Sequence, residues 1–449
     1  MLIRRATSGL RNTTPSRPSP PRRAAEATTD RHVDRFVPVA APPKRPNLLS
    51  LDKLMPKVKG SERTEADALA EARDLLLGGP TDREENGAEI LRDAPKVNSS
   101  LDTSEKNARH VGAETQLEAN AELEEARLAG LTEEDRASYD AVKQRCLDAG
   151  DPVAALALQT MLFEGKLPGE VDRAGEGTTL DHLAALGDES TELAAGVDRD
   201  QLVCDLVQEL ATPSAIDQGG KGTCAPTTIA IQLALENPAE YARITAGLAS
   251  PGGEVVLAGG QTLKREFLTA RDDGSRRSAV QRLMAPAFME MANGDENYVN
   301  RTDDGSGATS EELDVLYEAV MGRPMSNAYF DTDEERAGGM DIIDTQLRAG
   351  ATIPAGLEWD GGYHKVLVTG TETVDGQEYV TYINPWGREE RMPREDFEAR
   401  LTNVNYDPWK QLIGTFLART DAGSGDGQSG DRSGLHADAE RARRAIING

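Results

Sequence analysis

Three side chains in the second half of the sequence could together perform nucleophilic catalysis: Cys224, His364 and Asn384. A cysteine attacks a carbonyl carbon when a histidine accepts its proton and an amide or carboxylate orients that histidine. Cys224 follows a glycine-rich stretch and opens an apolar segment that has Pro226 near its start. This pattern predicts a helix that begins at Cys224, because proline is tolerated in a first turn. The partial positive charge at that helix end would favour the reactive thiolate.

His364 and Asn384 are expected at the ends of two paired strands. Two apolar segments flank Asp375-Gly376, a dipeptide that strongly favours a hairpin turn. His364 opens the first segment and Asn384 ends the second, and another strand is predicted over 351–359. We therefore expect an antiparallel sheet to bring both side chains to the cysteine, although they are far from it in the sequence.

The stretch QGGKGTC, from Gln218 to Cys224, resembles the signature of papain-like cysteine peptidases. In that family a glutamine stands six residues before the catalytic cysteine. The order cysteine, histidine, asparagine also matches, and His364 follows at a separation close to the roughly 130–150 residues of the family. The sequence NPWG at 384–387 resembles the family motif Asn-Ser-Trp-Gly.

The resemblance implies a role for each matched residue. Cys224 would be the nucleophile, His364 its base and Asn384 the residue that orients the base, while Gln218 and the Cys224 N–H would form the oxyanion hole. Trp386 would shield the hydrogen bond between Asn384 and His364. The implied fold is α+β and papain-like, with a helical half that carries the nucleophile helix packed on an antiparallel β half. The implied activity is hydrolysis of peptide or isopeptide bonds in a protein or peptide substrate, without a cofactor or a metal ion.

Three residues depart from the family pattern. Ala225 stands where a tryptophan is common, Lys221 where many members have a disulfide cysteine, and Lys365 where a small residue is usual. These changes bear on the shape of the subsites and the range of substrates. Two other functions are therefore kept open: a papain-fold deamidase or transglutaminase that acts as a bacterial effector or toxin, and an inactive papain-fold binding module.

Composition and periodicity divide the chain into five predicted parts. These are a disordered basic arm (1–60), solvated helices and linker (61–130), a helical region (131–204), the catalytic domain (205–418), and a flexible tail with a short helix (419–449). The helical region directly precedes the catalytic domain, so it is interpreted as a pro-segment or a docking region.

Charge and cysteine content narrow the classes of protein. The chain of 449 residues has a net charge of −27, which disfavours binding to nucleic acid or to anionic membranes. It has neither a long apolar run nor a secretory signal, so we expect a cytoplasmic protein or one exported without such a signal. The three cysteines lack the spacing of a zinc site or a disulfide framework, and Cys146 and Cys204 are expected to be inert buried thiols.

Overall fold

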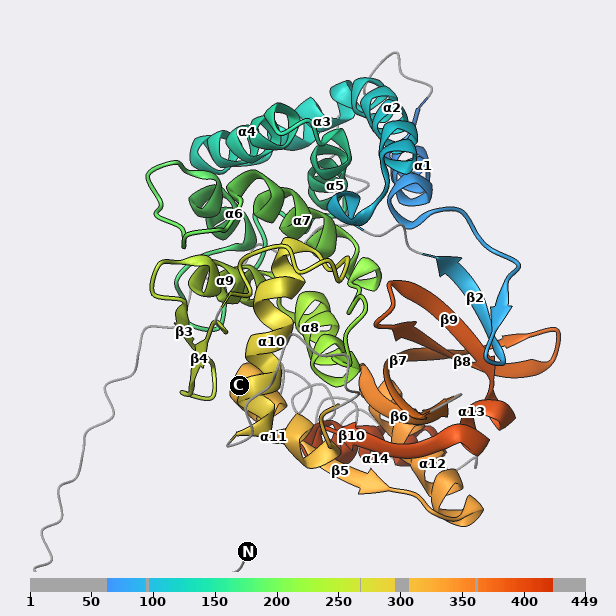
Figure 1. Ribbon diagram of the computed structural model, residues 1–449. Coiled ribbons are helices and arrows are strands. Elements are labelled where there is room, and N and C mark those ends of the chain that lie inside the picture. Colours follow the sequence, from blue (N-terminus) through green and yellow to red (C-terminus); the bar gives the residue numbers. More distant parts are fainter. Residues whose placement is uncertain (1–62, 94–96, 267, 295–306, 360–361, 423–449) are drawn as a thin grey trace, which may run out of the picture. The chain divides into compact units, whose positions relative to one another are not determined.

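Helices fill the first half of the described chain, and most strands lie in the second half (Figure 1). The computed structural model describes residues 63–93, 97–266, 268–294, 307–359 and 362–422. All of them belong to one compact unit. The predicted basic arm and all but the start of the predicted tail lie outside the described residues.

The helices of the first half form a layered cluster above the sheet in the view of Figure 1. They are α1 (Glu65–Leu77), α2 (Thr103–Ala119), α3 (Ala121–Leu128), α4 (Glu133–Asp148), α5 (Pro152–Phe163), α6 (Thr179–Gly187) and α7 (Arg199–Ala211). A second group continues the cluster towards the sheet. It consists of α8 (Cys224–Glu236), α9 (Pro238–Ala249), α10 (Ala279–Asn293) and α11 (Ser310–Met321).

The strands of the second half belong to an eight-stranded sheet in the described part of the chain. It contains β5 (Ser326–Tyr329), β6 (Ile353–Trp359), β7 (Gly362–Val374), β8 (Gln377–Asn384), β9 (Arg388–Pro393) and β10 (Leu401–Tyr406), joined by β1 (Glu84–Glu85) and β2 (Ala88–Asp93). The strand order is β1-β2-β9-β8-β7-β6-β10-β5, and every pairing is antiparallel. The chain is therefore α+β, as the sequence predicts.

The hairpin of β7 and β8 confirms the turn predicted at Asp375-Gly376. Val374 pairs with Gln377 across the turn, and the two turn residues have positive φ angles of 52° and 85°. Positive φ at both central positions is the property of the turn that matches the twist of paired strands. This turn fixes the register of the two strands, and with it the relative positions of the two strand ends that carry the candidate site.

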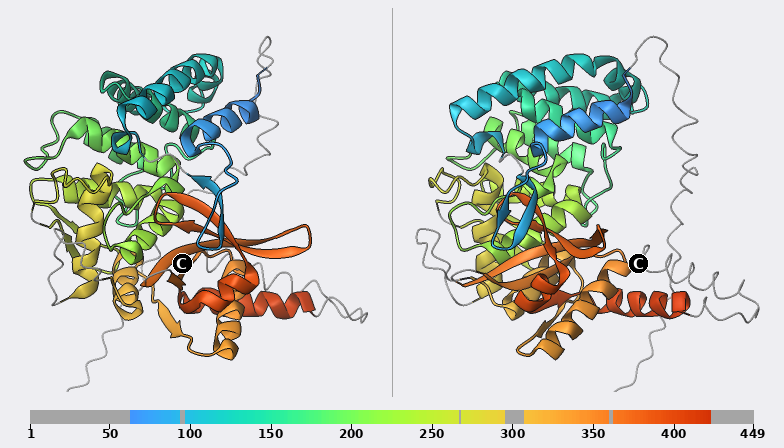
Figure 2. Two further views of the ribbon diagram at one scale, coloured as in Figure 1. Left: turned by 45° about the vertical axis from the view of Figure 1, so that its right-hand side comes forward. Right: turned by 90° about the vertical axis from the view of Figure 1, so that its right-hand side faces the viewer.

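Helices cover both faces of the sheet, as the views of Figures 1 and 2 agree. Leu367 of β7 and Ile383 of β8 are paired neighbours and join the large core of the helical cluster. Val366 and Val368 point to the other face, where they join a second core with residues of α12 (Asp333–Arg348) and α13 (Arg394–Arg400). The alternation of side chains along a strand explains why one strand serves both cores.

The helical region before residue 205 shares its core with the helices that follow. All twelve residues of α5 are buried, and a single apolar cluster runs from Ala72 through α7 and α8 to Ala292. The boundary predicted between residues 204 and 205 falls inside α7, whose apolar face is continuous across it. Removing the region as a pro-segment would take α5 out of this core and cut α7 in two, so the packing argues for a permanent part of the fold.

The stretch predicted to be solvated helices and linker also contributes to the sheet. Its β2 pairs with β9, and Arg391 of β9 holds Glu89 of β2 at 2.8 Å and Glu372 of β7 at 3.1 Å. A two-stranded unit of such polar residues gives no apolar periodicity, so the sequence alone does not indicate this pairing. The sheet edge is thus completed by residues more than 250 positions away in the chain.

The remaining elements close the two ends of the fold. Strands β3 (Glu254–Val256) and β4 (Thr262–Lys264) form a hairpin around the glycine pair at 259–260. Thr309 caps α11 in a reciprocal contact with Glu312. Helix α14 (Pro408–Ala422) includes residues 419–422, the first four of the predicted tail.

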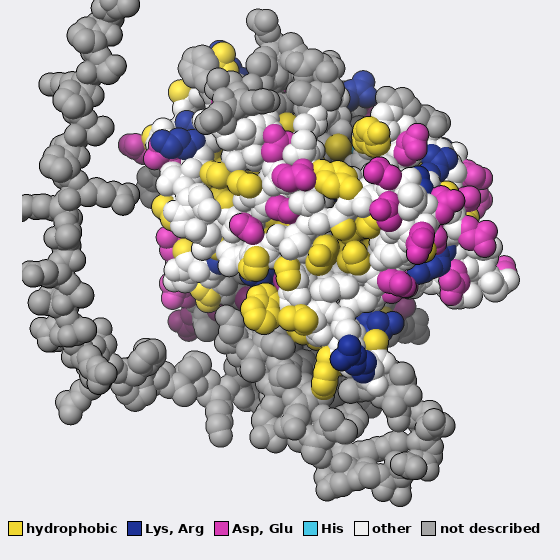
Figure 3. Space-filling model, turned by 90° about the horizontal axis from the view of Figure 1, so that it is seen from below, with side chains coloured by type: hydrophobic (Ala, Val, Ile, Leu, Met, Phe, Trp, Pro, Cys, Tyr) yellow, Lys and Arg dark blue, Asp and Glu magenta, His cyan; other side chains and the backbone are white. Residues whose placement is uncertain are grey.

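Acidic side chains gather along one side of the face seen from below, with hydrophobic side chains scattered across the rest of that face (Figure 3). This distribution accords with the net charge of −27. Within the described ranges, every helix is too short or too polar to cross a bilayer.

Candidate active site

Cys224 is the first residue of α8 and follows a loop that glycine makes possible. Gly219 in this loop has a φ of 61°, and a Cβ placed there would collide with the carbonyl oxygen of Ser275. The neighbouring Gly220 N–H donates to the same oxygen at 3.1 Å. The segment around Ser275 therefore holds the loop close, which fixes where the helix begins. Pro226 lies in the first turn, as predicted.

The thiol of Cys224 is half-buried and faces the start of β7. Burial raises the pKa of the Cys224 thiol, whereas hydrogen bonds from the N–H groups of Lys365 and Ala225 and the positive charge of Lys365 lower it. Thr228 ties the helix to the strand, since its Oγ1 donates to the carbonyl oxygens of Cys224 at 2.8 Å and Lys365 at 3.3 Å. The sulfur is thus next to the residue that follows His364.

His364 and Asn384 meet at the ends of β7 and β8. The imidazole Nε2 donates to Asn384 Oδ1 over 2.9 Å, and the two side chains are 6% and 0% exposed. Burial lowers the pKa of His364 to about 4, although the hydrogen bond with Asn384 acts in the opposite direction. A neutral imidazole that donates through Nε2 carries its lone pair on Nδ1. Nδ1 is therefore the atom that can accept a proton from a thiol.

Glu390 fixes the direction of this hydrogen bond and was not predicted from the sequence. The amide Nδ2 of Asn384 donates to both carboxylate oxygens of Glu390, at 3.1 and 3.2 Å. Because an ionised carboxylate only accepts hydrogen bonds, Nδ2 must face Glu390 and Oδ1 must face His364. Burial raises the pKa of Glu390, and the hydrogen bonds from Asn384 lower it. Glu390 pairs with Tyr382 across β8 and β9, and this pairing is the feature that could have indicated the role of Glu390.

Two tryptophans enclose the imidazole. The ring of Trp386 stacks on His364 with centroids 4.4 Å apart and planes inclined by 27°. Trp359 lies 5.3 Å from the same ring and packs edge-on against Trp386 at 5.8 Å. Such apolar cover keeps water from the hydrogen bond between His364 and Asn384 and strengthens it. The ring of Trp386 thus covers one face of the His364 ring.

Gln218 lies beside the turn that carries Asn384. Its backbone N–H donates to the Pro385 carbonyl oxygen at 2.7 Å, and Asp217 forms an isolated bridge with Trp386. The side-chain Nε2 donates to the Lys221 carbonyl oxygen at 2.7 Å. An amide nitrogen has two hydrogens, so one remains for another acceptor. The glutamine loop and the asparagine turn are thereby joined into one structure.

The structure gathers Gln218, His364, Asn384 and Trp386 through these contacts and brings Cys224 against the residue after His364. Among the described residues, no hydrogen bond joins the Cys224 sulfur to the His364 ring. Catalytic hydrogen bonds are often long in the absence of substrate and tighten when it binds.

The other two cysteines pack together inside the helical cluster. Cys146 of α4 and Cys204 of α7 are 0% and 3% exposed, and their thiols contact each other. The hydrogen bond with Cys146 and burial raise the pKa of Cys204 far above its ordinary value. Both have the environment of an unreactive thiol.

One cavity lies away from these residues, between the far end of α8 and the sheet. It has a volume of about 720 Å³ and is lined by residues that include Gln232, Glu236, Tyr317 and Arg323, but neither Cys224 nor His364 lines it. In the described part of the chain, no cluster of three or more His, Cys, Asp or Glu side chains is arranged to hold a metal ion. Comparison of the sequence with protein-family models and with curated proteins finds no match.

Proposed function

We propose that this chain has a papain-like arrangement and hydrolyses peptide or isopeptide bonds, with Cys224 as nucleophile. The observation that carries the proposal is the buried hydrogen bond from His364 Nε2 to Asn384 Oδ1 beneath Trp386. It leaves Nδ1 as the proton acceptor at the strand end where the thiol of Cys224 lies. The chain order and the NPWG sequence at 384–387 support the same conclusion.

The proposed reaction begins with transfer of the Cys224 proton to Nδ1 of His364. The sulfur then attacks the carbonyl carbon of the substrate and forms a C–S bond, while the oxyanion accepts hydrogen bonds from the Cys224 N–H and the free N–H of Gln218. As the C–N bond breaks, the imidazolium gives its proton to the leaving amine. Water then adds to the thioester and loses a proton to His364, and the C–S bond breaks to regenerate the thiol.

Digestion of a peptide library, read by mass spectrometry, tests this proposal. The wild-type chain and Cys224→Ala are compared with Cys204→Ala, a matched control that removes a buried thiol from α7. New peptide termini are expected with the wild type and with Cys204→Ala, and none with Cys224→Ala. Cleavage that survives in Cys224→Ala would rule out the proposed nucleophile.

The same samples separate the other two functions. Release of ammonia without new termini, lost in Cys224→Ala, would instead identify a deamidase or a transglutaminase. If the wild type shows neither product and an electrophilic probe does not label Cys224, the fold serves binding alone.

A further inference from the structure

Lys365 places a buried positive charge next to the proposed nucleophile. Its side chain is only 6% exposed, and its Nζ donates to Asn405 Oδ1 at 2.7 Å and to Ser310 Oγ at 3.5 Å, with a further contact to Asn403 Oδ1. Removing an ammonium group from water is costly unless hydrogen bonds and an opposite charge compensate. The three oxygens satisfy the donors of the ammonium group, but all three belong to neutral side chains.

The pocket that holds Lys365 is built across three strands. Lys365 of β7 pairs with Gly356 of β6, which in turn pairs with Asn403 of β10. A Cβ at Gly356 would collide with the side chain of Asn403. The missing side chain therefore lets Asn403 lie over β6 and reach the lysine. This specific arrangement shows that the ammonium position is determined by the fold.

Cys224 is one of the few ionisable groups whose charge acts on this ammonium. Lys365 and His364 are adjacent on a strand, so their side chains lie on opposite faces of the sheet. The backbone N–H of Lys365 bonds to the thiol, and the lysine charge also acts on the thiol. Both residues are described, and no hydrogen bond joins Nζ to the sulfur. The ammonium therefore acts through its electric field and not by transferring a proton.

The other charged groups near the ammonium lie on α11. Asp314 accepts hydrogen bonds from Asn405 at 2.8 Å and Asn327 at 2.6 Å, and Glu311 accepts one from the Tyr329 hydroxyl at 2.8 Å. Burial lowers the pKa of Lys365 to about 7, whereas the charges of Cys224, Asp314 and Glu311 raise it. The pKa of Tyr329 is raised from its ordinary value by burial, so this group stays neutral near pH 7. Asp314 and Glu311 thus favour the protonated form of Lys365.

We propose that the Lys365 ammonium stabilises the Cys224 thiolate from the face of the sheet opposite His364, as a positioning residue that acts on the charge of the nucleophile. The inference rests on the proposed role of Cys224. It explains how a thiolate forms beside a histidine whose burial disfavours the imidazolium. Transfer of the thiol proton to His364 leaves a negative sulfur, and the lysine lowers the energy of that state.

The test is the pH dependence of iodoacetamide alkylation at Cys224, measured by peptide mass spectrometry in the full-length chain. Lys365→Met removes the charge but keeps the length of the side chain. We expect its alkylation midpoint to lie about one pH unit or more above that of the wild type, with alkylation about tenfold slower near neutral pH. Lys264→Met, which removes the same charge from an exposed site on β4, is expected to leave the profile unchanged.

An unchanged midpoint in folded Lys365→Met would overturn the inference. If circular dichroism shows that this variant does not fold, Lys365→Gln decides the matter, because its neutral amide can still donate to Asn405 but carries no charge, so the midpoint should again lie above that of the wild type. A midpoint that stays in place there would also overturn the inference.

Alkylation requires no substrate, so the two proposals can fail separately. A shifted profile in a chain that cleaves no peptide rejects the proposed function and leaves the electrostatic role in place. A chain that cleaves peptides with an unchanged profile rejects only the role of Lys365.

Discussion

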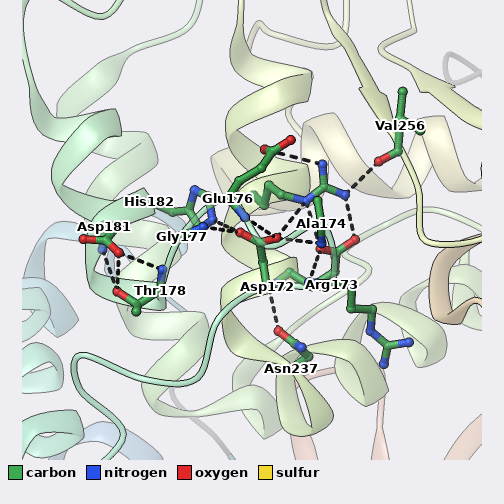
Figure 4. A network of polar contacts seen from close by, with 12 residues as sticks. Asp172, Arg173, Ala174, Glu176, Gly177, Thr178, Asp181, His182, Asn237 and Val256 are labelled. Carbon is green, nitrogen blue, oxygen red and sulfur yellow. Dashed lines mark hydrogen bonds and ion pairs between the residues drawn. The ribbon is translucent and has the colours of Figure 1, made fainter. Parts of the chain in front are cut away.

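Two histidines in this molecule, one half-buried and one buried, are held by different partners. His182 of α6 donates through Nε2 to the carboxylate of Asp172 at 2.7 Å, whereas His364 donates to the neutral amide of Asn384 at 2.9 Å. Figure 4 shows the first environment, in which the Asp172 carboxylate also accepts N–H groups from Ala174 and Gly177. The Asp172 carboxylate thus has partners of complementary charge and polarity.

The charges around Asp172 serve the fold. Arg243 of α9 bonds to Glu240 at 2.8 Å, lies 3.8 Å from Asp172, and donates to the Val256 carbonyl oxygen at 2.7 Å. Although burial acts against it, hydrogen bonds from His182 and from backbone N–H groups lower the pKa of Asp172. This network therefore ties α6 to α9 and to the β3 strand.

The environment of His364 lacks such compensation. Its hydrogen-bonded partner is neutral, two tryptophans exclude water, and burial lowers its pKa. The hydrogen bond from Nε2 of His364 to Asn384 leaves the lone pair of Nδ1 to accept a proton. The comparison teaches that His182 belongs to a network of charged groups that joins elements of the fold, whereas His364 has neutral and apolar partners.

The largest expected effect comes from replacing each of the two histidines by alanine in turn. His364→Ala should lower kcat/KM for peptide hydrolysis about 10³-fold or more, because the proton acceptor is lost. His182→Ala should leave the activity of the folded fraction within about threefold of the wild type and lower its stability instead. Steady-state kinetics on the folded protein distinguish the two. Equal losses of activity would remove the distinction between the two histidines.

Gln218→Ala should have the next largest effect. Losing one oxyanion donor is expected to lower kcat about 10²–10³-fold with little change in KM, because the donor acts on charge that develops in the transition state. Gln208→Ala on α7 is the control for loss of a buried glutamine. A change confined to KM would show that Gln218 binds substrate in the ground state.

Asp172→Ala should act on stability alone. It leaves His182 and several N–H groups without their acceptor and removes the ion pair with Arg243, so we expect the free energy of unfolding to fall by about 3 kcal/mol or more. Urea denaturation measures this change, with the m-value as a check that the unfolding transition is the same. A loss of activity per folded molecule would instead connect this network to the active site.

The smallest expected effect is a pH dependence of stability that belongs to His364. Burial lowers the pKa of His364 from its ordinary 6.5 to about 4. The folded chain therefore binds fewer protons than the unfolded chain between these values, and stability falls as the pH falls from 6.5 to 4. The contribution, complete above pH 6.5, is about 3 kcal/mol at most. The difference in unfolding free energy between the wild type and His364→Gln, measured by urea unfolding across this pH range, should change with pH in this way. A difference that is the same at every pH would contradict the prediction.

Sequence patterns predicted the local parts of the site better than their surroundings. The helix that begins at Cys224 and the Asp375-Gly376 hairpin each depend on neighbouring residues, and the structure confirms them. Their rules concern turns and helix ends, which are set by a few consecutive residues. The papain-like roles of Cys224 and Gln218 remain predictions.

The parts that the sequence did not indicate depend on contacts between distant residues. Glu390 reads as an ordinary charged residue of a strand, and only the fold shows that it is 2% exposed and directs the amide of Asn384. The pairing of β2 with β9 and the pocket around Lys365 have the same origin. Charged residues carry no apolar periodicity, so burial of such groups cannot be inferred from the pattern.

The most direct test of the central claim is the rate at which iodoacetamide alkylates each cysteine near pH 7 in the wild type, His182→Ala and His364→Ala. We expect Cys224 alone to react quickly in the wild type and in His182→Ala. In His364→Ala we expect Cys224 to react at least about tenfold more slowly than in the wild type, because the thiol has lost its proton acceptor. Equal rates at Cys224 in all three proteins, or equally fast alkylation of Cys146 and Cys204, would contradict it.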